Sequence, residues 1–299
     1  MRPEAVCDFY IPDHPKGGIV IVHGMAEHRQ RYDEFARFLE GNGYAAVLYD
    51  LPGHGCACSK EDWGWFGEDD GWQTLVNSAF EMIHILREKV SGRPLVLFGH
   101  SMGSMIARCL LQENDAVLDG LILSGAPCYQ AIARFGLLLA KMVRMHKGAR
   151  GHSAFLDKLT IGGFNAGIPD ARTPFDWLSY NKENVDQYIA DPRDGFPFTV
   201  QGYADEISGC IRMHEVRKYH CTKPQLPILF FAGKDDPCTG GDRGLQDSIH
   251  TLQKAGYQSI CCKRYDHMRH ETLQEINRVL VMQDVITWLN ENVACEGCL

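Results

Sequence analysis

The sequence predicts an α/β fold, in which a mostly parallel central sheet has helices on both faces and a helical cap inserted between two of its strands. Short apolar runs, typical of strands buried on both faces, alternate with helical patterns over residues 1–126 and return after residue 223. Residues 127–223 contain no convincing buried strand. The length of 299 residues, with 45% hydrophobic and 23% charged residues, suits one large soluble α/β domain or two small ones.

The expected elements follow one another in the order that such a sheet requires. Residues 19–22 are four β-branched residues in a row and predict a strand buried on both faces. Residues 32–39 repeat apolar side chains at helical spacing, and Gly41 and Gly43 end that helix. Further strands are expected at residues 7–11, 44–49, 95–98, 121–123, 227–231 and 259–265, and further helices at residues 72–90, after the strand at 95–98, and at residues 274–293.

A strand, a sharp turn and a helix meet at Ser101. The strand runs straight into Gly-His-Ser-Met-Gly at residues 99–103, and a helical pattern follows. In this context Gly-x-Ser-x-Gly is typical of the nucleophile elbow of α/β-hydrolases, where the serine backbone is strained and only glycine fits between strand and helix. Residues 151–153 repeat Gly-His-Ser, but no second glycine follows and no strand precedes them. We therefore interpret Ser101 as the candidate nucleophile and Gly99 and Gly103 as its elbow glycines.

The serine needs an imidazole to take its proton and a carboxylate to orient that imidazole. In α/β-hydrolases the acid and then the base follow the serine along the chain. Asp235 and Asp236 both lie just past the strand expected at residues 227–231. His267 and His270 both lie past the last expected strand. Spacing alone does not choose within either pair.

Two main-chain N–H groups are expected to bind the oxyanion of the reaction. One belongs to Met102, directly after the serine, and the other to Met25, in the loop after the strand at residues 19–22. His23 begins this loop, and we interpret it as a structural residue rather than a second base. Because the carboxyl ends of parallel strands meet at one edge of a sheet, the loop and the serine are expected to lie close together.

The inserted residues 127–223 are interpreted as a cap over this edge of a core formed by residues 1–126 and 224–299. They contain an expected apolar helix at residues 129–146 and then an aromatic, turn-rich stretch. So many large apolar residues outside the main core favour a role in binding substrate. The candidate substrate contacts are Phe135, Leu138, Met142, Phe175 and Trp177.

Charge and cysteine content argue against several other classes of protein. The formal net charge of -8 does not favour a nucleic-acid partner. The sequence shows no signal core and no apolar run of membrane length, so we expect a cytoplasmic protein with at most transient contact to a membrane surface. The twelve cysteines are irregularly spaced and are expected to be thiols. Cys56-x-Cys58 and Cys295-x-x-Cys298 each lack a second pair of ligands, so no metal site is expected.

Three motifs together resemble the monoacylglycerol lipase and lysophospholipase family, also described as serine aminopeptidase-like hydrolases. They are His-Gly-x-x-Glu-His-x-x-Arg-Tyr at residues 23–32, Asp-Leu-Pro-Gly-His-Gly at residues 50–55, and the elbow. The run from residue 172 to residue 199 resembles the bacterial members, so the resemblance covers almost the whole chain. It implies Asp236 as the acid, because the family's acid motif is Gly-x-x-Asp, often followed by proline. It implies His270 as the base, because that histidine lies within Arg-His-Glu, five residues after a tyrosine.

The chain also departs from the family pattern. It begins late, so the resemblance implies that an N-terminal edge strand is missing. Ser104 follows the elbow where the family commonly has a second glycine, and Cys56-Ala57-Cys58 replaces a small polar run. Neither change is expected to alter the chemistry.

These residues predict a serine hydrolase of carboxylic esters that needs no metal or cofactor. The apolar cap favours monoacylglycerol, lysophospholipid or related acyl esters as substrates, and the oligomeric state stays open. An aminopeptidase or amidase of the same fold is the alternative, and it needs a carboxylate in the cap to pair with the substrate's α-ammonium. A binding protein that has lost catalysis is a further alternative. The carboxylates available for an α-ammonium are Asp170, Asp176, Glu183, Asp186, Asp205 and Glu206.

Overall fold

The computed structural model describes residues 6–293 and places a seven-stranded sheet at the centre of that part of the chain. The strands lie in the order β1-β3-β2-β4-β5-β6-β7, and β1 alone runs antiparallel to its neighbour among these described strands. This arrangement confirms the predicted α/β fold. The strands are β1 (Cys7–Tyr10), β2 (Gly17–Val22), β3 (Tyr44–Tyr49), β4 (Leu95–His100), β5 (Gly120–Ser124), β6 (Ile228–Gly233) and β7 (Ile260–Tyr265).

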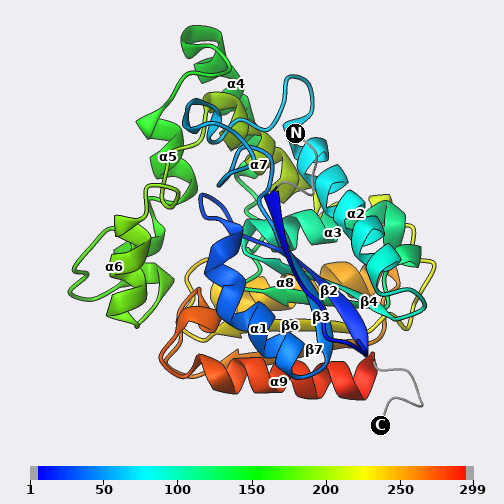
Figure 1. Cartoon of the computed structure of the whole chain (residues 1–299). Coiled ribbons are helices and arrows are strands. Elements are labelled where there is room, and N and C mark those ends of the chain that lie inside the picture. Colours follow the sequence, from blue (N-terminus) through cyan, green and yellow to red (C-terminus); the bar gives the residue numbers. More distant parts are fainter. Residues whose placement is uncertain (1–5, 294–299) are drawn as a thin grey trace.

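Helices cover both faces of the sheet (Figure 1). On one face, α1 (Asp33–Gly41) and α9 (Arg278–Asn292) bury apolar side chains against Ile19 and Ile21 of β2. On the other face, α2 (Gly71–Lys89), α3 (Met102–Asn114) and α8 (Gly241–Ala255) contribute apolar side chains to the buried cluster that contains Val20 and Val22. Successive side chains of a strand point to opposite faces, so β2 must be apolar at every position to serve both layers.

The strands agree closely with the sequence-based prediction, and the helices agree less well. The helix expected at residues 274–293 is a short 3-10 turn, Thr272–Gln274, followed by α9. The helix expected at residues 129–146 is α4 (Ala133–Lys147). Helix α8 was not predicted, because it begins at Gly240-Gly241 with no side-chain cap and carries only a sparse apolar stripe.

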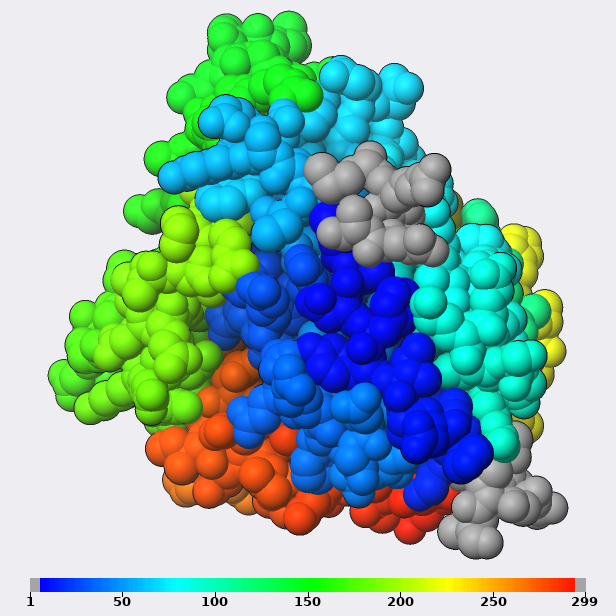
Figure 2. All heavy atoms as spheres, in the orientation of Figure 1, coloured from blue at the N-terminus to red at the C-terminus, as the bar shows by residue number. Residues whose placement is uncertain are grey.

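Residues 127–223, which we call the inserted segment, connect β5 to β6. Their described helices are α4, α5 (Ala154–Thr160), α6 (Lys182–Ala190) and α7 (Val200–Arg212), and none of their residues joins the sheet. The helices α5 to α7 were predicted only as an aromatic, turn-rich stretch. Figure 2 shows the green and yellow-green atoms of the inserted segment standing along one side of the molecule, next to the orange atoms that follow β7.

Across residues 6–293, no helix combines the length and the apolar character that crossing a membrane requires.

Candidate active site

Ser101 occupies the sharp turn between β4 and α3. Its backbone angles are φ 51° and ψ -120°, a region that residues other than glycine rarely adopt. A Cβ atom on Gly99 would lie 2.4 Å from the carbonyl oxygen of Gly103, and one on Gly103 would lie 2.2 Å from that of Val22. Strand and helix therefore pass too closely for any side chain at these glycines. This is the geometry expected of a nucleophile elbow.

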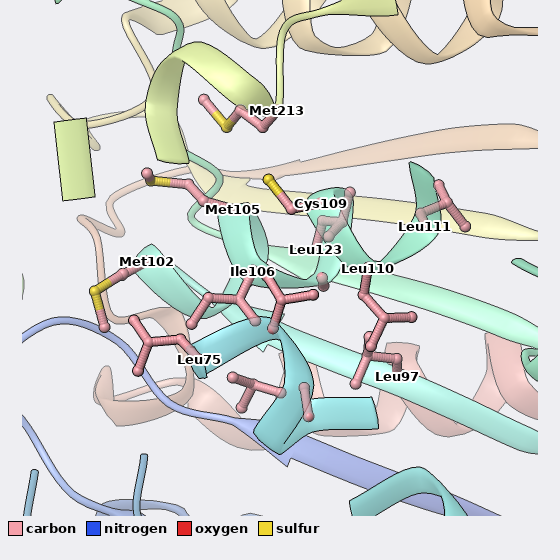
Figure 3. Packing of buried hydrophobic residues seen from close by; sticks show 14 of the residues in the cluster. Leu75, Leu97, Met102, Met105, Ile106, Cys109, Leu110, Leu111, Leu123 and Met213 are labelled. Carbon is pink, nitrogen blue, oxygen red and sulfur yellow. The ribbon is translucent and has the colours of Figure 1, made fainter. Parts of the chain in front are cut away.

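The helix behind the serine is held by the core. Met105, Ile106 and Leu110 of α3 are buried in the same cluster as Leu75 of α2. Figure 3 shows Ile106 and Leu110 on the side of α3 that faces Leu75, and Met105 on the side that faces Met213 of the inserted segment. Packing on several sides fixes the start of α3, and so it fixes the strained residue in front of it.

His270 and Asp236 lie in contact, each in a loop after a strand. His270 Nδ1 is 3.0 Å from Asp236 Oδ2, and both side chains are almost fully buried. The N–H of Cys238 donates to the other carboxylate oxygen at 2.8 Å. Asp235 and His267 are exposed, and Asp235 accepts a hydrogen bond from a tyrosine instead. The structure thus brings together the two residues that the family resemblance implied.

The charges around His270 favour its protonated form. Burial alone lowers the pKa of His270, but the charge and hydrogen bond of Asp236, and then the charges of Glu271 and Glu27, outweigh it and raise this pKa above its usual value of 6.5. The indole of Trp177 packs on the imidazole with 5.0 Å between ring centroids. These contacts position the ring as well as tune it.

The loop after β2 is held by a buried carboxylate. The N–H of Gly24 and the hydroxyl of Tyr32 both donate to Oε1 of Glu27. Met25, which follows Gly24, lines the cavity beside Ser101, and so does Met102. Met102 is the first residue of α3, where a main-chain N–H has no acceptor within the helix. Both predicted oxyanion residues therefore lie where the sequence analysis expected them.

His23 is a structural residue, as predicted. It is fully buried, and burial lowers its pKa to about 3, so the imidazole is neutral. The N–H of Leu51 donates to His23 Nε2 at 3.0 Å, and His23 Nδ1 lies 2.8 Å from the carbonyl oxygen of Gly24. The ring therefore ties the end of β2 to the loop after β3.

Arg31 joins three parts of the site through a buried guanidinium group. Its Nε lies 3.2 Å from Glu27, Nη2 lies 2.7 Å from Glu271, and Nη1 lies 3.4 Å from Asp194. The ring of Tyr188 packs over the same group at 4.8 Å. Glu27 belongs to the loop after β2, Glu271 follows His270, and Asp194 belongs to the inserted segment. The motif at residues 23–32 contains Glu27 and Arg31, but the sequence did not reveal that this arginine also joins Glu271 and Asp194.

A cavity of about 570 Å³ opens in front of Ser101 and His270. The inserted segment supplies much of its wall. Phe164, Tyr188 and Phe196 were not among the candidate contacts, although the aromatic composition of the segment was a signal for them. The aromatic residues that line the cavity are Phe135, Phe164, Phe175, Trp177, Tyr188 and Phe196.

Comparison with known families identifies the fold family. A family model described as "Serine aminopeptidase, S33" matches residues 13–277, which is most of the chain. The chain belongs to this family. The motifs on which the predicted resemblance rests lie within the matched residues, so the S33 assignment confirms that resemblance.

Several curated and solved relatives of this S33 chain are named lipases or esterases. A "Monoglyceride lipase" of Mus musculus is 23% identical over 97% of this chain and 88% of its own. A "Monoacylglycerol lipase" of Mycolicibacterium smegmatis is 27% identical over 95% and 92%. The structure of a thermostable carboxyl esterase from Bacillus coagulans has a TM-score of 0.89 at 26% identity, covering 96% and 94%. The predicted enzyme class, a carboxylic-ester hydrolase, is confirmed.

Three of the five candidate substrate contacts line the cavity of this S33 chain, and two do not. Phe135, Phe175 and Trp177 line it. The prediction for Leu138 and Met142 is wrong, because they lie on α4 away from the cavity and are 54% and 52% exposed. Apolar residues occupy more than one face of α4, so periodicity did not show which face meets the cavity. Transient contact of this exposed face with a membrane surface stays a prediction.

The inserted segment holds both loops of the S33 site. The N–H of Glu271, next to the candidate base, donates to the carbonyl oxygen of Leu178 at 2.8 Å. On the other side of the cavity, the carbonyl oxygen of Ala26 accepts from the N–H of Gly195 at 2.8 Å and from the hydroxyl of Tyr188 at 3.2 Å. The segment is therefore part of the framework that positions the candidate base and the predicted oxyanion loop.

One group of residues in the described part of the chain has the side chains of a metal site. Potential ligand atoms of His28, Asp191 and Asp194 lie within 4.8 Å of one another. Arg193 donates to Asp191 through Nη2 at 2.6 Å and Nε at 3.0 Å, and Arg31 pairs with Asp194. Because guanidinium groups already neutralise the carboxylates, we interpret the group as ion pairs between the inserted segment and the oxyanion loop.

The nine cysteines from Cys56 to Cys262 are free thiols. Cys56 and Cys58 do not belong to the described group of potential metal ligands. Cys295 and Cys298 lie outside the described residues.

Proposed function

We propose that the chain hydrolyses carboxylic esters with a Ser101-His270-Asp236 triad, through an acyl-enzyme. The observation that carries the proposal is the 3.0 Å contact between His270 Nδ1 and Asp236 Oδ2, beside a cavity whose wall holds Ser101 at the elbow. Membership of the S33 family and the named activities of the relatives support it.

Each residue has a role that follows from its chemistry. Neutral His270 takes the proton of Ser101 as Oγ attacks the ester carbonyl, and the imidazolium then gives this proton to the departing alcohol. Asp236 holds the imidazole through Nδ1 and stabilises its positive charge. Water, activated by the same histidine, attacks the acyl-enzyme and releases the acid. The N–H groups of Met25 and Met102 stabilise the tetrahedral oxyanion, and losing one such donor costs about 3 kcal/mol.

Replacement of the nucleophile tests this mechanism. Ser101→Ala is expected to lower kcat by about 10⁶-fold and to abolish labelling by a fluorophosphonate probe, because alanine lacks the hydroxyl group that attacks. Ser153→Ala is the matched control, since Ser153 lies in the other Gly-His-Ser run, far along the chain from the elbow. Near-normal turnover by Ser101→Ala would disprove the mechanism.

For the substrate we propose an acyl ester with a hydrocarbon chain, such as a monoacylglycerol or lysophospholipid, held under residues 127–223 as a cap. The aromatic wall of the cavity supports an apolar acyl chain. Each buried CH₂ group contributes about 0.8 kcal/mol, so kcat/KM is expected to rise about fourfold per carbon until the cavity is filled. A series of p-nitrophenyl esters, beside monoacylglycerol, measures this. Activity confined to acetate and butyrate esters would contradict the lipid substrate.

A further inference from the structure

A carboxyl group of the inserted segment lies in the cavity without a partner. Of the six carboxylates that the sequence offered for an α-ammonium, Glu206 of α7 is the one that lines the cavity. Its neighbour Asp205 also lies on α7 but points elsewhere, since it accepts a hydrogen bond from Gln201 at 2.8 Å and would contact any side chain at Gly71. The structure therefore selects one carboxylate from the set that sequence left open.

Glu206 is unsatisfied in the described part of the chain. It makes no hydrogen bond or ion pair there, and its Oε2 atom is fully buried. Burial raises its pKa to about 7, and the nearby charge of Asp157 adds to this effect. An uncompensated buried carboxyl group costs stability, and such groups in native proteins usually have a functional explanation. A ligand that donates a hydrogen bond would remove this cost.

Glu206 lines the cavity together with Cys238, which lies two residues past Asp236 in the chain. Burial, then Asp236, Cys128 and Glu206 raise the pKa of Cys238, so Glu206 acts on the same region as the acid loop. The N–H of Cys238 in turn donates to Asp236. Cys128, Glu206 and Cys238 line the cavity, whereas Asp236 does not. Ser101 and Glu206 line the same cavity, so a substrate that fills it meets both residues.

We propose that Glu206 determines specificity by accepting a hydrogen bond from a donor group, a hydroxyl or an ammonium, on the alcohol portion of the ester. The acyl chain offers only C–H groups, so the donor must come from the other side of the ester bond. This inference rests on the proposed function, because it takes Ser101 as the nucleophile. It adds that esters of polyols or amino alcohols are better substrates than esters of simple alcohols.

The two sources of the donor respond differently to pH. Among the described residues, the titratable groups that act with Glu206 are Asp157, Tyr203, Cys210 and Cys238, and Lys158 is a charged residue that lines the same cavity. Glu206 loses its proton as pH rises through about 7, so it then holds an ammonium more tightly. A hydroxyl group donates to either form and depends less on pH. The hydrolysis of both esters depends in the same way on the protonation of His270. Dividing kcat/KM for one ester by kcat/KM for the other at the same pH therefore cancels this shared pH dependence.

Three octanoate esters test the inference in the full-length protein. Propyl octanoate has no donor, 1-octanoylglycerol carries two hydroxyl groups, and 2-(dimethylamino)ethyl octanoate carries an ammonium. The wild type is expected to prefer one donor-bearing ester to propyl octanoate by about tenfold, the scale of one hydrogen bond to a charged group. For each donor-bearing ester, kcat/KM is divided by kcat/KM for propyl octanoate at the same pH. If this ratio rises from about pH 6 to about pH 8 for the amino ester, the donor is an ammonium. If the glycerol ester is preferred and its ratio does not change with pH, the donor is a hydroxyl.

Substitutions then assign the preference to Glu206. Glu206→Leu is expected to remove the roughly tenfold preference, and Glu206→Gln to retain part of it for the glycerol ester only. The control is Glu183→Gln on α6, an exposed carboxylate of the same segment that does not line the cavity.

Three outcomes would overturn the role of Glu206. One is a wild-type preference for the donor-bearing esters over propyl octanoate of less than about twofold, and this measurement does not depend on whether a variant folds. Another is an equal loss of kcat/KM for all three esters in Glu206→Leu, which would show a structural role. Failure of the wild type to hydrolyse any of the three esters would instead overturn the proposed function itself, and the inference with it.

Discussion

His270 is a buried imidazole whose pKa is set by opposing effects. Burial lowers this pKa, and the carboxylates of Asp236, Glu271 and Glu27 together raise it above 6.5. The base must be neutral to accept the serine proton, so kcat/KM is expected to fall as pH drops through the raised pKa of His270. The acidic limb of the pH profile should therefore have its midpoint above 6.5.

Glu271→Gln tests which neighbour contributes to this midpoint. Removing the negative charge lowers the pKa of His270, so the acidic limb is expected to move to lower pH. Asp266→Asn is the matched control, because Asp266 lies in the same loop but is exposed and pairs with Lys234. The pH profile of kcat/KM on one ester measures both variants. An unshifted limb in Glu271→Gln, or an equal shift in the control, would contradict the assignment.

At the residue scale, the sequence selected the candidate triad residues more successfully than the residues of the cavity wall. Ser101 could be found because the elbow is encoded within five consecutive residues, and the family motifs selected Asp236 and His270 from open pairs. Leu138 was wrongly placed and Glu206 was not singled out. The direction of a side chain on an inserted helix depends on how that helix packs, and no local pattern encodes it.

The elbow is the element in which backbone geometry is most restricted. Gly103→Ala would bring a Cβ atom to 2.2 Å from the main chain of Val22, which must then move. We expect a loss of about 3 kcal/mol in the free energy of unfolding, together with slower labelling of Ser101. Chemical denaturation and the rate of fluorophosphonate labelling measure the two effects.

Gly41→Ala serves as the control for that substitution. Gly41 is the last residue of α1, and a Cβ atom there meets nothing within 4 Å. The alanine variant is expected to be stabilised by about 0.5–1 kcal/mol, because alanine favours a helix more than glycine does. Equal destabilisation of the two variants would contradict a specific steric restriction at the elbow.

At the element scale, strands could be predicted more reliably than helices. β2 to β5 are buried on both faces, so their apolar runs stand out from the rest of the sequence. Helix α8 has buried residues only along one stripe, including Leu245, Ile249 and Leu252, and it begins at glycines. Its stability comes from packing on the sheet, which the local sequence does not show.

At the scale of the whole molecule, Arg31 connects the oxyanion loop, the base loop and the inserted segment. Arg31→Met leaves Glu27, Glu271 and Asp194 buried without their shared cation. Breaking a buried ion pair from one side costs about 3–5 kcal/mol, so a loss of that size is expected in the free energy of unfolding. A fall in kcat is expected as well, because both catalytic loops lose an anchor.

Arg37→Met is the matched control for Arg31. Arg37 lies in α1 and pairs with Asp33 at the exposed surface, where ion pairs contribute little. Urea unfolding and kcat on one ester should show no measurable change in this variant. If Arg31→Met behaved like Arg37→Met, the guanidinium would not join the three parts of the site.

The hydrogen bonds of the inserted segment divide it into two parts that differ in their freedom to evolve. Residues 176–195 hold the base loop through Leu178 and the oxyanion loop through Gly195, so mutations there alter catalysis itself. Helices α4 and α5 contribute Phe135 and Leu159 to the wall of the cavity. Unlike residues 176–195, these two helices make no hydrogen bond to either loop within the described part of the chain. Libraries that aim to change substrate range should therefore vary residues 132–160 and leave residues 176–195 intact, because only the first part can diverge without disturbing the catalytic machinery.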